Sequence, residues 1–235
     1  MATAAPGAPR ANIDFGRAFT FVGEDPEWLK KLLIGGAFTF ACALLVGIPF
    51  VLGYFSRTLR NVVAQASPTL PEWDDLSGLF EEGLRLTAVY LVYLLGVLVV
   101  LGVLVAVALL PVLATSGSGR PSDALAAFSA LGVFALYGIL MLVSLALAVY
   151  LPAALARAAL RGNVSDGFAW RENLEFIRVN LANYALTLVS YLIASFLGQF
   201  GILLCCVGVF PAAFWGYLVL ASALGQTVRL SPRPV

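Results

Sequence analysis

Long apolar stretches separated by short polar segments dominate the chain. They cover residues 29–55, 86–114, 124–156 and 181–224. A helix needs ~20 apolar residues to cross the ~30 Å hydrocarbon layer of a membrane. The last stretch is too long for one span, so it predicts two helices that turn among the glycines between Gly198 and Gly208. The pattern therefore predicts an all-α, polytopic membrane protein.

The first stretch fits two descriptions, and charge distinguishes them. It forms either one kinked span or two short helices around Gly47-Ile48-Pro49. A single crossing divides the basic residues five to nine between the two sides, whereas a hairpin places thirteen of the fourteen on one side and only Arg120 opposite. Lys and Arg near span ends collect on the cytoplasmic side. The sequence thus favours a hairpin with both termini cytoplasmic, and it leaves open whether this hairpin spans fully or is re-entrant.

Short amphipathic segments precede the three predicted hairpins. Each places apolar side chains three or four residues apart, on one helical face, and each contains a tryptophan or is soon followed by one. The apolar faces are Phe15, Ala18, Phe19 and Val22, then Trp73, Leu76, Phe80 and Leu84, then Trp170, Leu174, Ile177 and Leu181. Such helices lie in the headgroup layer. We therefore expect three units of interfacial helix plus membrane hairpin, with about six membrane helices.

These units divide a single integral membrane domain over residues 1–235. Unit one covers 13–64, unit two 65–161 and unit three 162–229, between flexible ends at 1–12 and 230–235. The alternative is that the units are unrelated, because any multi-pass protein needs polar connectors with tryptophan at the interface.

Composition excludes several classes of protein. Hydrophobic residues make up 61% of the chain and charged residues 11%, with a net charge of +1. Soluble domains carry about 25% charged residues, so a soluble globular protein is excluded. A disordered chain and a nucleic-acid binder that needs a basic field are excluded as well. With no histidine and no metal-ligand spacing among Cys42, Cys205 and Cys206, we expect no metal and no cofactor.

The predicted membrane interior lacks ionisable side chains. No Asp, Glu, Lys, Arg or His lies within 86–114, 124–156 or 181–224. Proton relays and ion-coupled pumps usually need such groups at membrane depth, which argues against a proton-coupled transporter. We expect Asn183, Ser190, Ser195 and Gln199 to serve helix packing rather than a solute path. Gly96, Gly102, Gly132 and Gly138 are expected to allow close helix approach.

The candidate contact residues fall into an acidic block and a set of arginines. We select Glu72, Trp73, Asp74, Asp75, Arg57, Arg60, Arg157 and Arg161 as contacts to a partner or to lipid headgroups. The acids suit a basic partner surface, and each cation near an anionic membrane contributes ~1 kcal/mol. The simpler explanations are that Asp74 or Asp75 caps a helix and that the arginines mark topology.

Several blocks of this chain resemble prokaryotic membrane proteins grouped as domain of unknown function 4013. The blocks include Asp14-Phe15-Gly16-Arg17-Ala18-Phe19, Glu24-Asp25-Pro26-Glu27-Trp28, Leu70-Pro71-Glu72-Trp73-Asp74-Asp75 and Leu79-Phe80-Glu81-Glu82-Gly83-Leu84. The Pro-Glu-Trp-Asp-Asp block is the most specific of them. The resemblance implies an integral membrane protein of a bacterium or archaeon, and it implies no catalytic residues.

Three functions compete on this sequence. We favour a non-enzymatic module of the cytoplasmic membrane that binds anionic lipid headgroups or a cytoplasmic protein through its charged face, because the charges gather there. The alternative is a transporter or channel for a neutral or amphiphilic substrate. The third is an enzyme that uses the acidic block at the headgroup layer. Hydrolysis by a serine inside the membrane is disfavoured, because a serine nucleophile lacks a base here.

Overall fold

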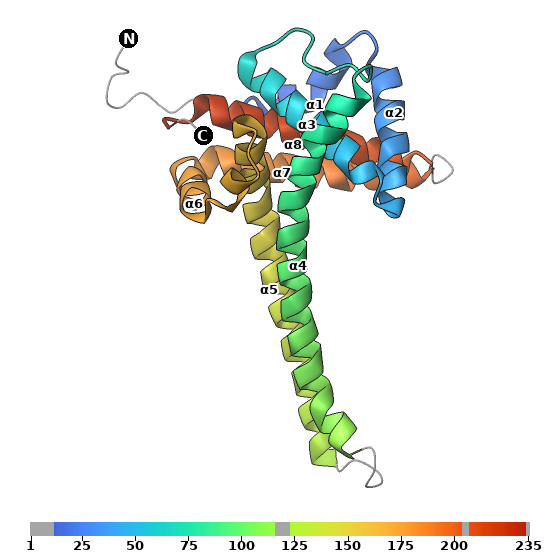
Figure 1. The fold of residues 1–235 in the computed structure, drawn as a ribbon, viewed down its shortest axis with the longest axis vertical. Coiled ribbons are helices and arrows are strands. Elements are labelled where there is room, and N and C mark those ends of the chain that lie inside the picture. The colour runs from blue at the N-terminus through green and yellow to red at the C-terminus, as the bar shows by residue number, and fades with distance from the viewer. Residues whose placement is uncertain (1–11, 116–122, 204–206, 234–235) are drawn as a thin grey trace. The chain divides into compact units, whose positions relative to one another are not determined.

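The computed structural model describes residues 12–115, 123–203 and 207–233, and every regular element among them is helical (Figure 1). The elements run α1 (Phe15–Thr20), η1 (Phe21–Glu24), α2 (Trp28–Ala41), η2 (Cys42–Leu44), α3 (Gly47–Ala64), α4 (Leu76–Thr115), α5 (Asp123–Arg161), η3 (Ser165–Phe168), α6 (Trp170–Val179), α7 (Leu181–Gln199), η4 (Phe200–Leu203) and α8 (Val209–Leu230). Of the predicted flexible ends, residues 1–11 and 234–235 lie outside the described residues, whereas residues 230–233 are described and Ser231 and Arg233 contact Asn180 and Glu175.

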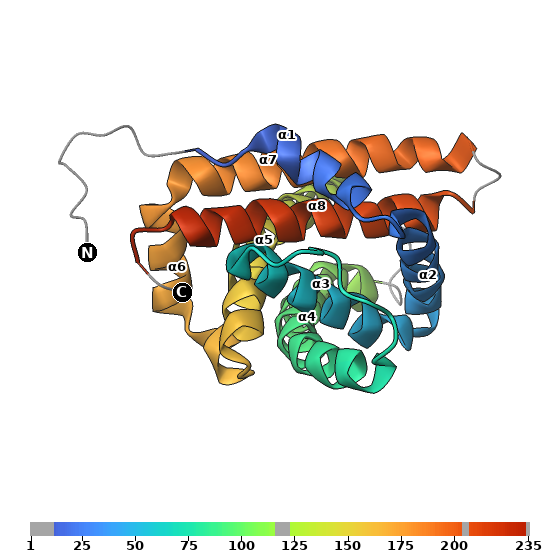
Figure 2. The ribbon, with the colours of Figure 1, turned by 90° about the horizontal axis from the view of Figure 1, so that it is seen from above.

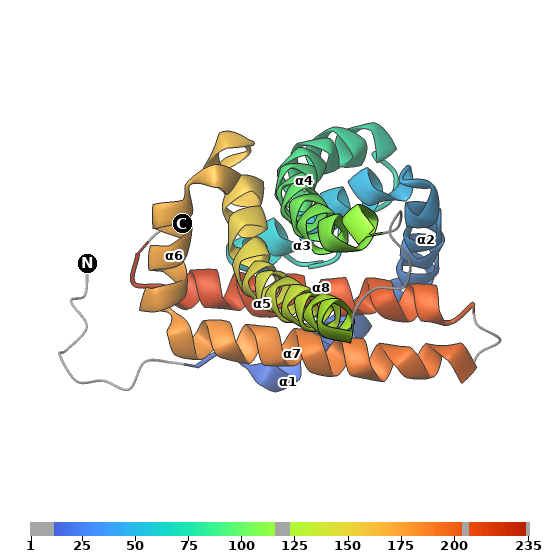
Figure 3. The same ribbon diagram turned by 90° about the horizontal axis from the view of Figure 1, so that it is seen from below.

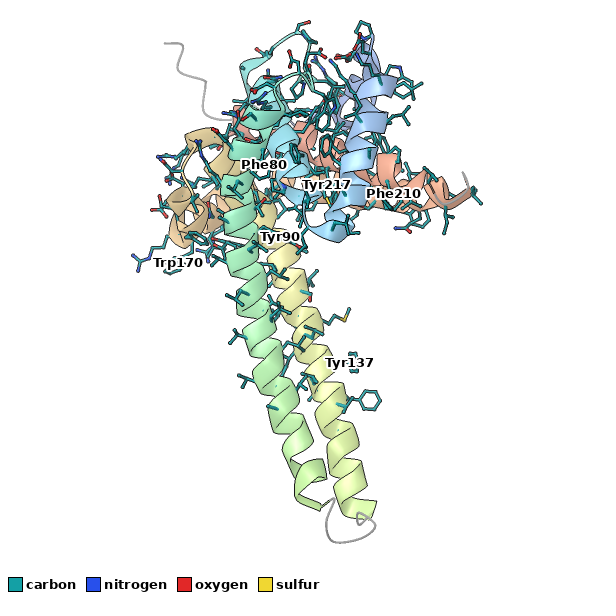
Figure 4. All side chains as sticks on the ribbon, turned by 45° about the vertical axis from the view of Figure 1, so that its right-hand side comes forward. Phe80, Tyr90, Tyr137, Trp170, Phe210 and Tyr217 are labelled. Carbon is teal, nitrogen blue, oxygen red and sulfur yellow. The ribbon has the colours of Figure 1, made fainter. Side chains whose placement is uncertain are left out.

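The chain forms two compact units. One contains residues 1–89 and 152–235, and the other contains residues 90–151 of α4 and α5. In the second unit the Tyr93 and Tyr150 hydroxyls lie 3.0 Å apart. Most of its exposed side chains within 90–106 and 131–151 are apolar, and Figure 4 shows Tyr137 pointing away from α5. Such a surface is typical of helices that contact lipid.

Helix α8 is the central helix of the first unit. Its side chains from Phe214 to Thr227 are mostly buried, and it packs against α2, α3 and α7. The N-terminal segment lies along α7 and α8, as Figure 2 shows. There the Ile13 N–H donates to Asn183 Oδ1 at 3.2 Å, and the Asp14 N–H donates to Gln226 Oε1 at 2.7 Å.

Four described helices are long and apolar enough to cross a membrane. They are Leu76–Ala106, Leu131–Arg161, Leu181–Leu203 and Val209–Leu230. The stretch 181–224 does form two helices, with the break inside the predicted region. The first stretch also forms two helices, α2 and α3, but α2 has 14 residues, a length of about 21 Å at 1.5 Å per residue. The expected total of six membrane helices is therefore not confirmed.

Two sequence expectations need changing. The surface helix predicted in unit two is not separate, because from Leu76 it is the first part of α4. Close helix approach does not occur at the predicted glycines: a Cβ at Gly96, Gly102, Gly132 or Gly138 would meet nothing within 4 Å. It occurs instead between α3 and α4, where a Cβ on Gly83 would collide with the Pro49 carbonyl, and one on Gly53 with that of Leu79.

Candidate functional site

The acidic block lies in the connection between α3 and α4, where it packs against the α2–α3 pair. The Trp73 ring stacks on Tyr54 and Phe38, with centroids 4.4 and 5.0 Å away. Its indole N–H donates to the Lys31 carbonyl at 3.1 Å, and the Tyr54 hydroxyl donates to the Pro71 carbonyl at 2.9 Å. Trp73 is thus half-buried and packs against the core of the protein.

A buried ammonium group ties this connection to α2. Lys31 is 3% exposed, and its Nζ donates to Asp25 Oδ2 at 2.7 Å and to Glu72 Oε1 at 2.5 Å. Burial acts to lower the pKa of Lys31, but the hydrogen bonds to the two carboxylates outweigh burial and raise that pKa above its ordinary value. The cluster is therefore a buried ion-pair network that holds the α3–α4 connection against α2.

A second ionic cluster joins α3 to the start of α4. Arg57 Nη2 donates to Asp75 Oδ2 at 2.6 Å and Arg57 Nε to Glu82 Oε1 at 3.1 Å, and Arg60 pairs with Glu82 as well. Asp75 also caps α4, because its Oδ1 accepts the Gly78 N–H at 2.9 Å. The hydrogen bond from Arg57, with that from Gly78, lowers the pKa of Asp75.

These contacts assign internal roles to most of the candidates near α3 and α4. Glu72 bonds Lys31, Asp75 caps α4 as the simpler explanation predicted, and Arg57 and Arg60 pair with acids of the same chain. Asp74 remains exposed. The structure thus brings six candidates together in one region, where their polar groups largely satisfy one another.

The other two candidates, Arg157 and Arg161, line a separate pocket of about 190 Å³. The end of α5, helix α6 and the segment around the end of α8 form it; Figure 3 shows α6 next to the start of α7 and the end of α8. Its further lining residues are Glu172, Glu175, Phe176, Val179, Asn180, Ser231 and Arg233. Sequence reasoning found the two arginines and missed these seven.

Hydrogen bonds fix the walls of this pocket. Arg157 is 7% exposed, and its Nε donates to Asn173 Oδ1 at 2.8 Å. Asn180 Nδ2 donates to Ser231 Oγ at 3.0 Å, which ties the start of α7 to the end of α8. Arg233 pairs with Glu175. The arrangement combines fixed polar walls with charges of both signs.

The polar side chains of α7 and α8 hydrogen-bond within the protein. Thr187 and Thr227 hydroxyls lie 2.9 Å apart, across the two helices. The Ser190 hydroxyl donates to the Leu186 carbonyl at 2.8 Å, one turn earlier in its own helix. The Ser190 bond lies within its own helix, so the packing role expected of Ser190 stays a prediction.

Among the described residues, no group of three His, Cys, Asp or Glu side chains could hold a metal ion. In the comparison with known proteins, the model of a family described as "Protein of unknown function (DUF4013)" matches residues 36–207, more than half of the chain. Neither a curated protein nor a solved structure matches.

Proposed function

The chain belongs to the protein family of unknown function DUF4013, and on that premise we propose that it is a non-enzymatic membrane module that binds lipid headgroups. The proposed ligand group is the headgroup phosphate, and the site is the pocket at Arg157 and Arg161. We place the protein in the cytoplasmic membrane of a prokaryote as a multi-pass protein with both termini cytoplasmic. The distribution of basic residues supports this orientation.

The position of the pocket carries the proposal. Arg161 is the last residue of α5, Asn180 directly precedes α7, and Ser231 directly follows α8. Each of these three helices is long and apolar enough to span a membrane. Spanning helices end where the hydrocarbon layer meets the headgroups. A pocket built from three such ends is therefore at the right depth for a headgroup.

The side chains of the pocket suit a phosphate. Arg157 and Arg161 are four residues apart on α5 and so share a helical face. A guanidinium group offers several N–H donors in a planar fork that matches phosphate oxygens. Arg157 is buried and oriented by Asn173, whereas Arg161 is exposed. Phe176 and Val179 give the pocket an apolar side for the lipid.

Replacing Arg161 tests this site. We expect Arg161→Ala to weaken the binding of a phospholipid to the purified, delipidated protein by about tenfold, which corresponds to 1.4 kcal/mol, because one phosphate contact is lost. Native mass spectrometry with a phosphatidylglycerol titration measures the change.

Arg178→Ala is the matched control. Arg178 is an exposed arginine of α6 that does not line the pocket. Its loss should leave the affinity unchanged. Equal weakening in both variants would mean that lipids respond only to total charge, and an unchanged affinity in Arg161→Ala would exclude the pocket as the site.

A further inference from the structure

We infer that the headgroup bound in this pocket is zwitterionic and carries a primary ammonium beside its phosphate, as an ethanolamine headgroup does. This inference rests on the proposed function and specifies its ligand. The reason lies in the charges of the pocket, which include two glutamates as well as three arginines.

One cation and one anion of the pocket have no ion-pair partner in the described part of the chain. Arg233 pairs with Glu175, and Arg157 is bonded to Asn173. Arg161 and Glu172 both line the pocket, yet they form no ion pair with each other or with another described residue. A ligand with a phosphate and an ammonium group complements both side chains at once, whereas a purely anionic ligand places negative charge beside Glu172.

The residues that line the pocket favour a primary ammonium group over a quaternary one. A primary ammonium has three N–H donors, which carboxylate oxygens accept. Quaternary ammonium groups are instead recognised by cages of several aromatic rings, and Phe176 is the sole aromatic residue that lines this pocket in the described chain. A volume of about 190 Å³ is below the ~300–1,000 Å³ of pockets for drug-sized ligands, so it fits a headgroup rather than a whole lipid.

Competition among three lipids with identical acyl chains tests the inference. The delipidated protein is titrated with phosphatidylethanolamine, phosphatidylglycerol and phosphatidylcholine, and the affinities are compared by native mass spectrometry. We expect phosphatidylethanolamine to bind about tenfold more tightly than the other two. Glu172→Gln should remove this preference, because the amide cannot neutralise the ammonium, while Glu81→Gln, at an exposed glutamate outside the pocket, should keep it.

The outcomes separate the inference from the proposed function. If the three lipids bind equally and Arg161→Ala weakens the binding of all three, the phosphate site is supported and the inferred preference for a zwitterionic headgroup is wrong. A preference that survives Glu172→Gln also overturns the inference. If Arg161→Ala changes nothing, the proposed function fails. Free phosphoethanolamine is the last competitor. If it displaces the lipid at an equal concentration, the site binds a soluble compound, and a lipid as its ligand is excluded.

Discussion

Lys31 illustrates how a charged side chain is stabilised inside this protein. The ammonium is removed from water, and removal of a charge from water is costly unless hydrogen bonds compensate for it. Asp25 and Glu72 supply that compensation, at 2.7 and 2.5 Å. Because the folded-state pKa lies above the ordinary 10.5, this contribution to stability is complete below pH 10.5 and is lost only as the pH rises through the folded-state value.

Lys31→Met tests whether the ion pairs of Lys31 stabilise the fold. Methionine keeps most of the side-chain volume but leaves the Asp25 carboxylate buried without its cation, so we expect a loss of about 3–5 kcal/mol in the free energy of unfolding. Tryptophan fluorescence during chemical unfolding in detergent measures it. Lys30→Met is the control, because Lys30 is exposed and pairs with Glu27 on the surface. Similar losses in the two variants would contradict the assignment.

At the scale of elements, small residues decide where helices meet. The α3–α4 crossing depends on Gly53 and Gly83, because a Cβ at either would overlap a backbone carbonyl of the facing helix. Backbone atoms cannot move aside as the end of a side chain can. Gly96, Gly102, Gly132 and Gly138 face open space instead, so glycine spacing alone does not reveal which helix faces touch.

Gly83→Ala and Gly96→Ala form a matched pair on α4. We expect Gly83→Ala to cost at least about 1–3 kcal/mol, the range for overpacking, because α3 and α4 must separate. Gly96→Ala adds the same methyl group where nothing lies within 4 Å, so it should leave stability unchanged or slightly raised. Thermal unfolding in detergent compares the two. An unchanged stability in Gly83→Ala would mean that α3 and α4 do not meet at this position.

At the scale of the whole molecule, orientation depends on the α2–α3 hairpin. If the chain enters and returns there, thirteen of its fourteen cationic side chains face the cytoplasm. The pocket at the end of α5 then opens at the headgroups of the cytoplasmic leaflet. A single crossing would divide the same charges between the two sides.

Single cysteines at Gln65 and Ser118 test this orientation, in a background that lacks Cys42, Cys205 and Cys206. In intact cells a membrane-impermeant maleimide should label Ser118→Cys, and Gln65→Cys should react only after the cells are opened. The reason is that an even number of crossings keeps residue 65 on the side of the N-terminus. Labelling of Gln65→Cys in intact cells, with Ser118→Cys protected until the cells are opened, would refute the hairpin, and the assignment of the pocket to the cytoplasmic leaflet with it.

Local sequence pattern predicted the features that depend on neighbouring residues: the helical class, the break within 181–224, and a cap on the helix by Asp74 or Asp75. Apolar length and capping act within one segment, so they can be read without the fold. The three-dimensional packing was needed to show that Asp75 is the cap, that Lys31 contacts Glu72, 41 positions away, and that Arg161 shares a pocket with Glu172 and Ser231. Such contacts depend on the path of the whole chain, because packing of distant helices, rather than local pattern, brings these side chains together.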